Sequence, residues 1–205
     1  MHKSKEITII SPQNFITSNW AGGTTTQLYI YPPDSEYIKR NFQYRISSAA
    51  VNLFECQFTQ LQGIKRKLLV LDGEIIIEHK NQYTKKLHKF DMDEFDGCWD
   101  TTSKGTCIDF NLMLQGELSG KLTPYRLKCE EELKIKTSKE TTELFIYLYK
   151  GDIEISSVDE KYNLLENHLL KALNTSSLNI HINSLADSEF VIIEIEKLAS
   201  ESDFS

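Results

Sequence analysis

The stretch Lys67–Ile77, KLLVLDGEIII, returns 78 residues later as Phe145–Ile155, FIYLYKGDIEI. Each copy holds an apolar run, a glycine followed by an acidic residue, and a β-branched strand. Because glycine adopts the positive φ of tight turns, Asp72-Gly73 and Lys150-Gly151-Asp152 each predict a β-hairpin. Two similar β units imply a pair of sheets or barrels, although the hairpins of any all-β protein can also align by chance.

Segments with strand character extend on both sides of each copy. They are short, rich in β-branched and aromatic residues, and bounded by Gly, Asp, Asn or Pro. Only Tyr162–Asn174 has a spacing that also suits a helix, and it lacks a clear cap. We therefore predict an all-β chain with strands at Thr25–Tyr31, Phe42–Val51, Ile64–Leu71, Glu74–Glu78, Thr106–Leu114, Glu143–Tyr149, Ile153–Ile155, Leu178–Ile182 and Phe190–Ile195.

A connection rich in turn-forming residues separates the two copies. Gly116, Ser119, Gly120 and Pro124 lie within nine residues of one another, a composition typical of a loop between units. The sequence therefore predicts an N-terminal unit over residues 1–120 and a C-terminal unit over residues 121–205.

Charge and hydropathy exclude several classes of function. The net charge of −7, from 23 basic and 30 acidic residues, should repel nucleic acid and anionic lipid. The mean hydropathy is −0.36 and no apolar run is long enough for a membrane span. Because Met1–Glu6 is polar where a secretory signal needs an apolar run, we expect a cytoplasmic protein. Four cysteines without a C-x-x-C spacing are interpreted as free, buried thiols.

Polar residues on two predicted strands are the first candidates for a binding site. A period of two places Arg45 and Ser47 on one face of their strand. In the same way Asp109 and Asn111 share one face, opposite Phe110 and its apolar neighbours. These four side chains could gather on a partly wet inner wall of a barrel, or they could form an ordinary solvent-facing surface.

Two further motifs could contribute to such a site. Trp20 precedes the pair Gly22-Gly23 and Thr24, a corner that could expose amides and hydroxyls to a ligand or be only a turn. Arg66 follows a glycine turn at the start of a strand. Its guanidinium suits a planar carboxylate, although an arginine more often pairs with a structural acid.

Metal and nucleophile signals are weak. The five histidines are isolated in sequence, and no two occupy one strand face at ligand spacing. His88 lies near Asp91, Asp93 and Glu94, which is interpreted as a charged loop. No motif of a hydrolase is present, so we expect neither a metal nor a cofactor.

Several motifs occur in an order that resembles the HutD/Ves family. The resemblance covers residues 14–114, and the second half matches only in its β pattern. The motifs are Trp20-x-Gly22-Gly23-x-Thr25, Arg45-x-Ser47-x-Ala49, Phe58–Arg66 with Gly63, Leu71-Asp72-Gly73, Phe95-x-Gly97 and Asp109-Phe110-Asn111-Leu112-Met113.

The resemblance implies a bicupin, two cupin-like jelly-roll barrels in tandem without the usual metal ligands. Family members are associated with histidine utilisation and are thought to tune that pathway by binding an intermediate such as formiminoglutamate, formylglutamate or urocanate. Bicupin chains commonly pair, so a homodimer is possible. The ligand-binding residues implied for this chain are Trp20, Thr24, Arg45, Ser47, Arg66, Asp109 and Asn111.

Three functions remain open on these grounds. The first is a non-enzymatic protein that binds a small anion, with Arg45 and Arg66 as the anchors. The second is a metal-independent isomerase or hydrolase that uses Asp109 as its base. The third is a dimeric stress or interaction protein without a ligand, for which a closed or fully apolar interior would be the sign. The chain departs from the family pattern at Ala21 and Thr26-Gln27, which leaves room for a different ligand.

Overall fold

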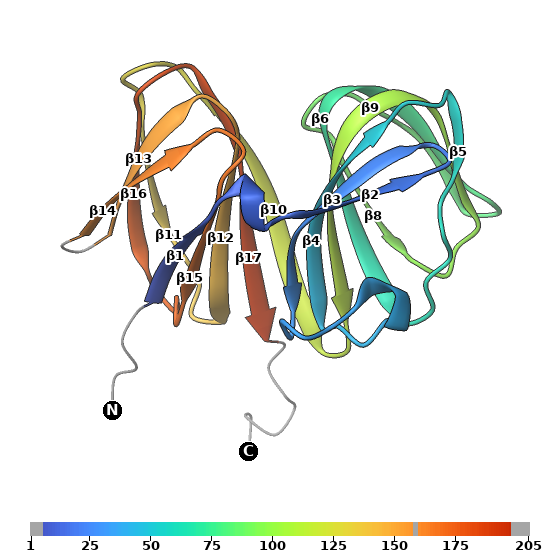
Figure 1. Ribbon diagram of the computed structural model, residues 1–205, viewed down its shortest axis with the longest axis horizontal. Helices are drawn as coiled ribbons and strands as arrows, with labels where there is room; N and C mark the ends of the chain where they lie inside the picture. Colours follow the sequence, from blue (N-terminus) through green and yellow to red (C-terminus); the bar gives the residue numbers. More distant parts are fainter. Residues whose placement is uncertain (1–5, 158–159, 198–205) are drawn as a thin grey trace. The chain divides into compact units, whose positions relative to one another are not determined.

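The computed structural model describes residues 6–157 and 160–197. The chain divides into two compact units (Figure 1). The N-terminal unit consists of residues 15–116, and the C-terminal unit consists of the described parts of 1–14 and 117–205. The described residues contain strands and two short 3-10 helices, η1 (Pro12–Asn14) and η2 (Tyr37–Lys39), and no α-helix. The prediction of an all-β chain is confirmed.

The N-terminal unit is one sheet of eight strands. Its order is β2 (Ile16–Trp20), β3 (Gly23–Tyr31), β4 (Tyr44–Val51), β9 (Thr101–Gln115), β6 (Ile64–His79) and β7 (Tyr83–Leu87). In addition, β5 (Glu55–Gln57) pairs with β9, and β8 (Met92–Asp96) pairs with β6. Every described pair is antiparallel, and β2 and β7 remain as edges, so these pairings do not close the sheet into a barrel.

The C-terminal unit has two sheets. The first contains β1 (Glu6–Ile10), β15 (Leu169–Leu173), β12 (Thr141–Lys150), β17 (Ser188–Lys197) and β10 (Leu118–Leu127), in that order. The second contains β11 (Glu132–Lys136), β16 (Asn179–Ser184), β13 (Asp152–Ser157) and β14 (Glu160–Leu165). The sequence analysis assigned residues 1–14 to the N-terminal half, whereas β1 pairs along its whole length with β15.

The predicted hairpin at Asp72-Gly73 is wrong. Strand β6 runs without interruption through these residues, and its register against β9 shifts by one residue between Val70 and Asp72. Gly73, with φ +79°, lies just after this β-bulge and inside the continuous strand, not in a turn. The bulge changes which side chains point inward, so Val70 before it and Ile75 after it belong to one apolar cluster.

The second predicted hairpin is also wrong, for a related reason. Strand β12 ends at Lys150 and β13 begins at Asp152, but they do not pair with each other. Instead, Gly151, with φ +99°, turns the chain from the first sheet of this unit into the second. A Cβ at Gly151 would lie 2.3 Å from Ser188 Oγ, so the corner has no room for a larger residue.

The repeat extends to the strand pairings. The two halves of β6 pair with β8, β7 and the two halves of β9, just as β12 and β13 pair with β15, β14, β17 and β16. Residues 66, 68 and 70 of β6 therefore correspond to residues 144, 146 and 148 of β12, at the offset read from the sequence.

The possible helix at 162–174 is instead two strands that belong to different sheets. Its two strands are β14 and β15, and Asn167, with φ +62°, lies in the turn between them. Leu164, Leu169, Leu170 and Ala172 are buried, and their spacing fits two strands as well as one helical face. Long-range pairing with β12 and β13 decides between the two.

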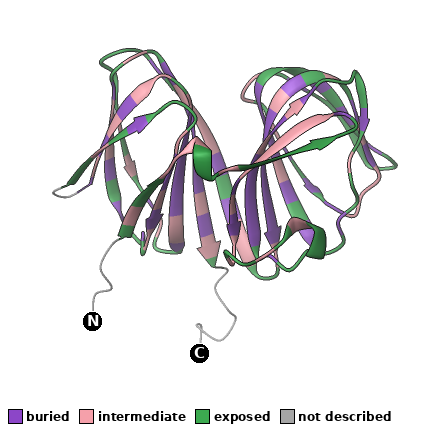
Figure 2. Ribbon diagram, in the orientation of Figure 1, coloured by how far each residue is buried: buried purple, intermediate pink, exposed green. Residues whose placement is uncertain are grey.

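Each unit has its own core (Figure 2). All four cysteines are free; Cys56 and Cys107 are buried, Cys98 is half-buried and Cys129 is exposed. The interpretation as buried thiols thus holds for two of them. None of the described helices has the length and apolar character needed to cross a membrane.

Candidate functional site

The register of three neighbouring strands builds the site. Strand β9 lies between β4 and β6, and Met113 is opposite both Arg45 on β4 and Arg66 on β6. Two residues further along the sheet, Asn111 is opposite Ser47. Because residues opposite one another share a face, all of these side chains point to the same side of the sheet.

A pocket of about 360 Å³ lies over this face. It brings together six of the seven predicted residues: Trp20, Arg45, Ser47, Arg66, Asp109 and Asn111. The seventh, Thr24, does not line it, whereas its neighbour Thr25 does, because adjacent residues of a strand point to opposite faces. Asp109 and Asn111 are only 2% and 5% exposed, so this wall is not an ordinary solvent-facing surface.

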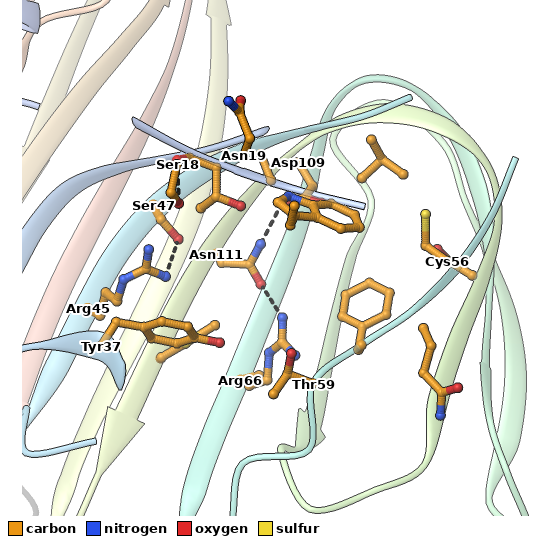
Figure 3. A pocket seen from close by; sticks show the side chains of 18 of the residues that line it. Ser18, Asn19, Tyr37, Arg45, Ser47, Cys56, Thr59, Arg66, Asp109 and Asn111 are labelled. Atoms are coloured by element: carbon orange, nitrogen blue, oxygen red, sulfur yellow. Dashed lines mark hydrogen bonds between the residues drawn. The ribbon is translucent and has the colours of Figure 1, made fainter. Parts of the chain in front are cut away.

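Arg45 is oriented by neutral neighbours. Its Nε donates to Gln27 Oε1 at 2.8 Å. One terminal nitrogen donates to Ser47 Oγ at 3.1 Å (Figure 3). The guanidinium carbon lies 4.5 Å from the centre of the Tyr37 ring. Burial lowers the pKa of Arg45. The hydroxyl of Ser47 accepts this bond, which leaves its own proton to donate elsewhere.

Arg66 is held in a similar way between two aromatic rings. Its guanidinium carbon lies 4.9 Å from the Phe58 ring centre and 5.1 Å from that of Phe95. One terminal nitrogen donates to Asn111 Oδ1 at 3.1 Å, and the buried Nε has no hydrogen-bond partner among the described residues. Burial lowers the pKa of Arg66 to about 10.

Asp109 lies at the far end of the same chain of polar groups. Asn111 Nδ2 donates to Asp109 Oδ1 at 2.5 Å, so Asn111 links the carboxyl to Arg66 (Figure 3). Burial raises the pKa of Asp109 to about 7, against the opposing effects of the Arg66 charge and the Asn111 hydrogen bond. Among the described residues no carboxylate oxygen lies within 4.0 Å of Arg66, so Arg66 is not paired with a structural acid.

The rest of the pocket wall includes large apolar groups as well as small polar ones. Trp20, 38% exposed, ends β2, and its ring lies against Gly22, where an added Cβ would be 1.9 Å from a ring carbon. The Gly22-Gly23 pair is therefore a tight turn that also makes room for the indole. Ile38, 89% exposed, belongs to the same lining. The pocket thus combines an apolar rim with a cationic floor.

Sequence analysis missed three residues that shape the arginines. Gln27, Tyr37 and Phe58 each contact a guanidinium, and none was singled out. Gln27 lies opposite Ser47 in the β3–β4 register, so correct pairing of these two strands would have indicated it. Tyr37 lies in η2, outside any strand, and no periodic signal pointed to it.

A second buried polar cluster lies outside the pocket lining. His79 Nδ1 is 2.8 Å from Thr101 Oγ1, and His79 Nε2 is 2.8 Å from Asp93 Oδ2. Tyr83 donates to the other oxygen of Asp93 at 3.1 Å. The interpretation of Asp93 as part of a charged loop is wrong, because β8 pairs with β6 and buries it. The described residues contain no cluster of three metal-binding side chains.

In the C-terminal unit, apolar groups fill part of the equivalent wall. By strand register, Asp109 corresponds to Phe190 and Asn111 to Ile192, because these residues lie opposite equivalent positions of β6 and β12. Phe190 and Ile192 are buried in the apolar core of their unit.

The neighbouring positions differ only in part, because Arg45, Ser47 and Met113 correspond by the same register to the polar residues Lys121, Thr123 and Glu194. Arg66 corresponds to Leu144, and Ala49, opposite Asp109, corresponds to Tyr125, opposite Phe190. Tyr125 stacks on Phe190 with ring centres 5.5 Å apart. Phe190, with Tyr125 stacked on it, therefore occupies the space that remains open beside Asp109 in the N-terminal unit.

Solved structures of similar fold cover nearly the whole chain. A conserved protein of unknown function from Pseudomonas aeruginosa is 19% identical, with a TM-score of 0.81 over 94% of this chain and 100% of that one. HutD from Pseudomonas fluorescens is 16% identical, with a TM-score of 0.71 over 95% and 100%. A bacterial pirin from Escherichia coli, in complex with nickel(II), is 11% identical, with a TM-score of 0.68 over 94% and 100%. No curated protein sequence matches the chain.

Fold and pocket together define a class: an all-β protein related in fold to cupin-type proteins, with buried guanidinium groups in the pocket of one unit. The sequence itself gives the family. It matches the HutD family profile over residues 13–190, and the chain belongs to the HutD family.

Proposed function

We propose that the protein binds a small carboxylate-bearing molecule in the pocket of the N-terminal unit and acts without catalysis. One observation carries this proposal: two buried guanidinium groups share a pocket, and within the described part of the chain their hydrogen bonds go only to neutral side chains. A buried charge without a counter-charge is costly. A carboxylate ligand would supply the missing negative charge and accept two parallel hydrogen bonds from a guanidinium.

The pocket also suits the remainder of such a ligand. Ser47 retains a hydroxyl proton to donate, and a carboxyl oxygen of Asp109 can accept from an amide, imine or amine of the ligand. Trp20 and Phe58 offer apolar surface. Formiminoglutamate, formylglutamate and urocanate have these groups, and the HutD family supports a role in tuning histidine utilisation.

We further propose that the two units are cupin-like jelly rolls in tandem. The repeated strand pairings support this, as do the fold relatives, which include oxalate decarboxylases as well as pirin. We also propose a cytoplasmic location, which the sequence supports, and a homodimer, which the family supports. An interior that is open and partly polar argues against the alternative of an interaction protein without a ligand.

A second candidate function is a metal-independent isomerase or hydrolase. It is favoured by Asp109, a buried carboxyl in the pocket with a pKa of about 7, because a general base works best near the ambient pH. Turnover of a candidate compound, lost in Asp109→Asn, would establish it.

The test of the proposed function is calorimetric titration of the purified protein with formylglutamate, urocanate, histidine and glutarate. Arg45→Met and Arg66→Met keep the length of the side chain and remove the charge, and we expect each to weaken binding at least tenfold. Arg126→Met, at an exposed arginine of the C-terminal unit, is the matched control and should bind normally. If no carboxylate binds at millimolar concentration, the proposed function is wrong.

A further inference from the structure

We propose that the pocket takes a dicarboxylate and that binding of the dicarboxylate carries one proton from solvent onto Asp109. This inference rests on the proposed function and deepens it by naming the charge of the ligand and the group that adjusts to it. It follows from where the two arginines lie, from what they contact, and from the carboxyl beyond them.

The two guanidinium groups approach the pocket from opposite sides of β9. Arg45 and Arg66 are both opposite Met113, so their Cα atoms are two strand spacings apart, roughly 10 Å. Each arginine bends along the sheet in the same direction, since Arg45 reaches Ser47 and Arg66 reaches Asn111 (Figure 3). A single carboxylate can face one guanidinium squarely, whereas two carboxylates on a short spacer can face both.

Each arginine also keeps donors for a ligand. A guanidinium has five N–H groups. Arg45 uses two of its nitrogens, on Gln27 and Ser47, and Arg66 uses one, on Asn111. Nε of Arg66 is buried and without a partner among the described residues. The described part of the chain therefore leaves donors unused on both groups.

The charges balance for a dianion only when Asp109 is neutral. Two guanidinium groups and an ionised Asp109 together carry a single positive charge, enough for a monoanion. A dicarboxylate beside an ionised Asp109 would place three negative charges against two positive ones in a site that excludes most water. Protonation of Asp109 removes that excess and also provides an O–H donor for a ligand oxygen.

Asp109 is the group in this pocket that can take up the proton near neutral pH. Its pKa is already raised to about 7 by burial, and a bound dianion would raise it further. The Asn111 amide favours the ionised form of Asp109, but it can also donate to the carbonyl oxygen of a carboxylic acid, so its hydrogen bond survives protonation.

None of the other charged or titratable groups that face the pocket is expected to take up a proton near neutral pH. On β6, Arg66 has a pKa lowered to about 10 and keeps its charge below that pH. Burial raises the pKa of Cys107 on β9 and that of Cys56 on β5, so both thiols stay neutral. The remaining such groups that face the pocket are Arg45 on β4, which stays protonated, and the phenol of Tyr37 in η2.

The experiment is calorimetry with succinate and glutarate as dicarboxylates and propionate as the monocarboxylate. Titrations at pH 8 in two buffers with different ionisation enthalpies give the number of protons taken up. For the wild-type protein we expect close to one proton per dicarboxylate. Its affinity should fall from pH 7 to pH 9 by roughly 50-fold, if the pKa in the complex exceeds 9.

Asp109→Asn is the decisive variant, because an amide copies the shape and neutrality of the protonated acid. It should bind the dicarboxylates with no proton uptake and with an affinity independent of pH over this range. Dicarboxylate binding without proton uptake by the wild-type protein, or propionate binding as tight as that of succinate, would overturn the inference and leave the proposed function standing. Absence of binding by all three compounds would overturn both.

Discussion

Substitution of Asp109 by Asn should stabilise the protein without ligand, by an amount that grows with pH. The physical reason is the burial that raises the pKa of this carboxyl from 3.8 to about 7. At about 1.4 kcal/mol per pH unit, the ionised form costs the folded state roughly 4 kcal/mol. An asparagine of the same shape carries no such penalty.

The direction of this pH dependence follows from comparing the protonation of Asp109 in the folded and the unfolded chain. Below pH 3.8 the carboxyl is protonated in both the folded and the unfolded chain and contributes nothing. Between that pH and about 7 the unfolded chain ionises while the folded chain does not, so stability falls as pH rises. Above about 7 both are ionised and the full penalty remains.

Urea unfolding of both proteins at pH 4.5 and pH 8 measures this effect. The expected gain from Asp109→Asn is about 1 kcal/mol at the lower pH and about 4 kcal/mol at the higher, a difference of about 3 kcal/mol in which packing effects cancel. Exposed Asp34→Asn controls for the loss of one negative charge. A difference below about 1 kcal/mol, or a larger gain at the lower pH, would refute the reasoning.

Three other perturbations test separate parts of the structure. Gly73→Ala should lower the free energy of unfolding in urea by at least about 2 kcal/mol, because Gly73 has φ +79° and an added Cβ would meet a β9 carbonyl oxygen at 2.5 Å. Gly63→Ala is its control: Gly63 has φ +72° but open space around it, so the loss should be only about half as large. Gln27→Glu should give Arg45 an internal counter-charge and weaken succinate binding about tenfold in calorimetry. His79→Leu removes two buried hydrogen bonds and should cost about 3 kcal/mol in urea unfolding, with ligand affinity unchanged.

The polar wall of the site was predictable because it depends on strand parity alone. Arg45 with Ser47, and Asp109 with Asn111, share faces in any strand that contains them. Which face turns inward, and that β9 lies between β4 and β6, required the pairing register, a long-range property. For the same reason Thr24 was predicted in place of Thr25: the alternation of side chains along a strand does not say which of two adjacent threonines faces the pocket.

The hairpins were mispredicted because one local signal serves several backbone geometries. A glycine of positive φ after an apolar run occurs in a two-residue hairpin, next to a bulge in a continuous strand and at a corner between sheets, so the local sequence does not separate the three. What separates them at Gly73 is the continuous ladder that β6 makes with β9. The same ladder, with β8, brings His79, Asp93 and Thr101 together from positions that seem isolated in sequence.

The C-terminal unit allows the polar pocket of the N-terminal unit to be compared with a second copy of the same strand arrangement. Its C-terminal unit repeats the strand pairings of the N-terminal unit, yet places Leu144, Phe190 and Ile192 where the other has Arg66, Asp109 and Asn111. The strand pairings therefore do not require these polar groups, and burying them is less favourable than burying hydrocarbon. The polar groups of Arg66, Asp109 and Asn111 lower the stability of one copy and have no polar counterparts in the other, which supports the proposal that a negatively charged ligand completes the N-terminal site.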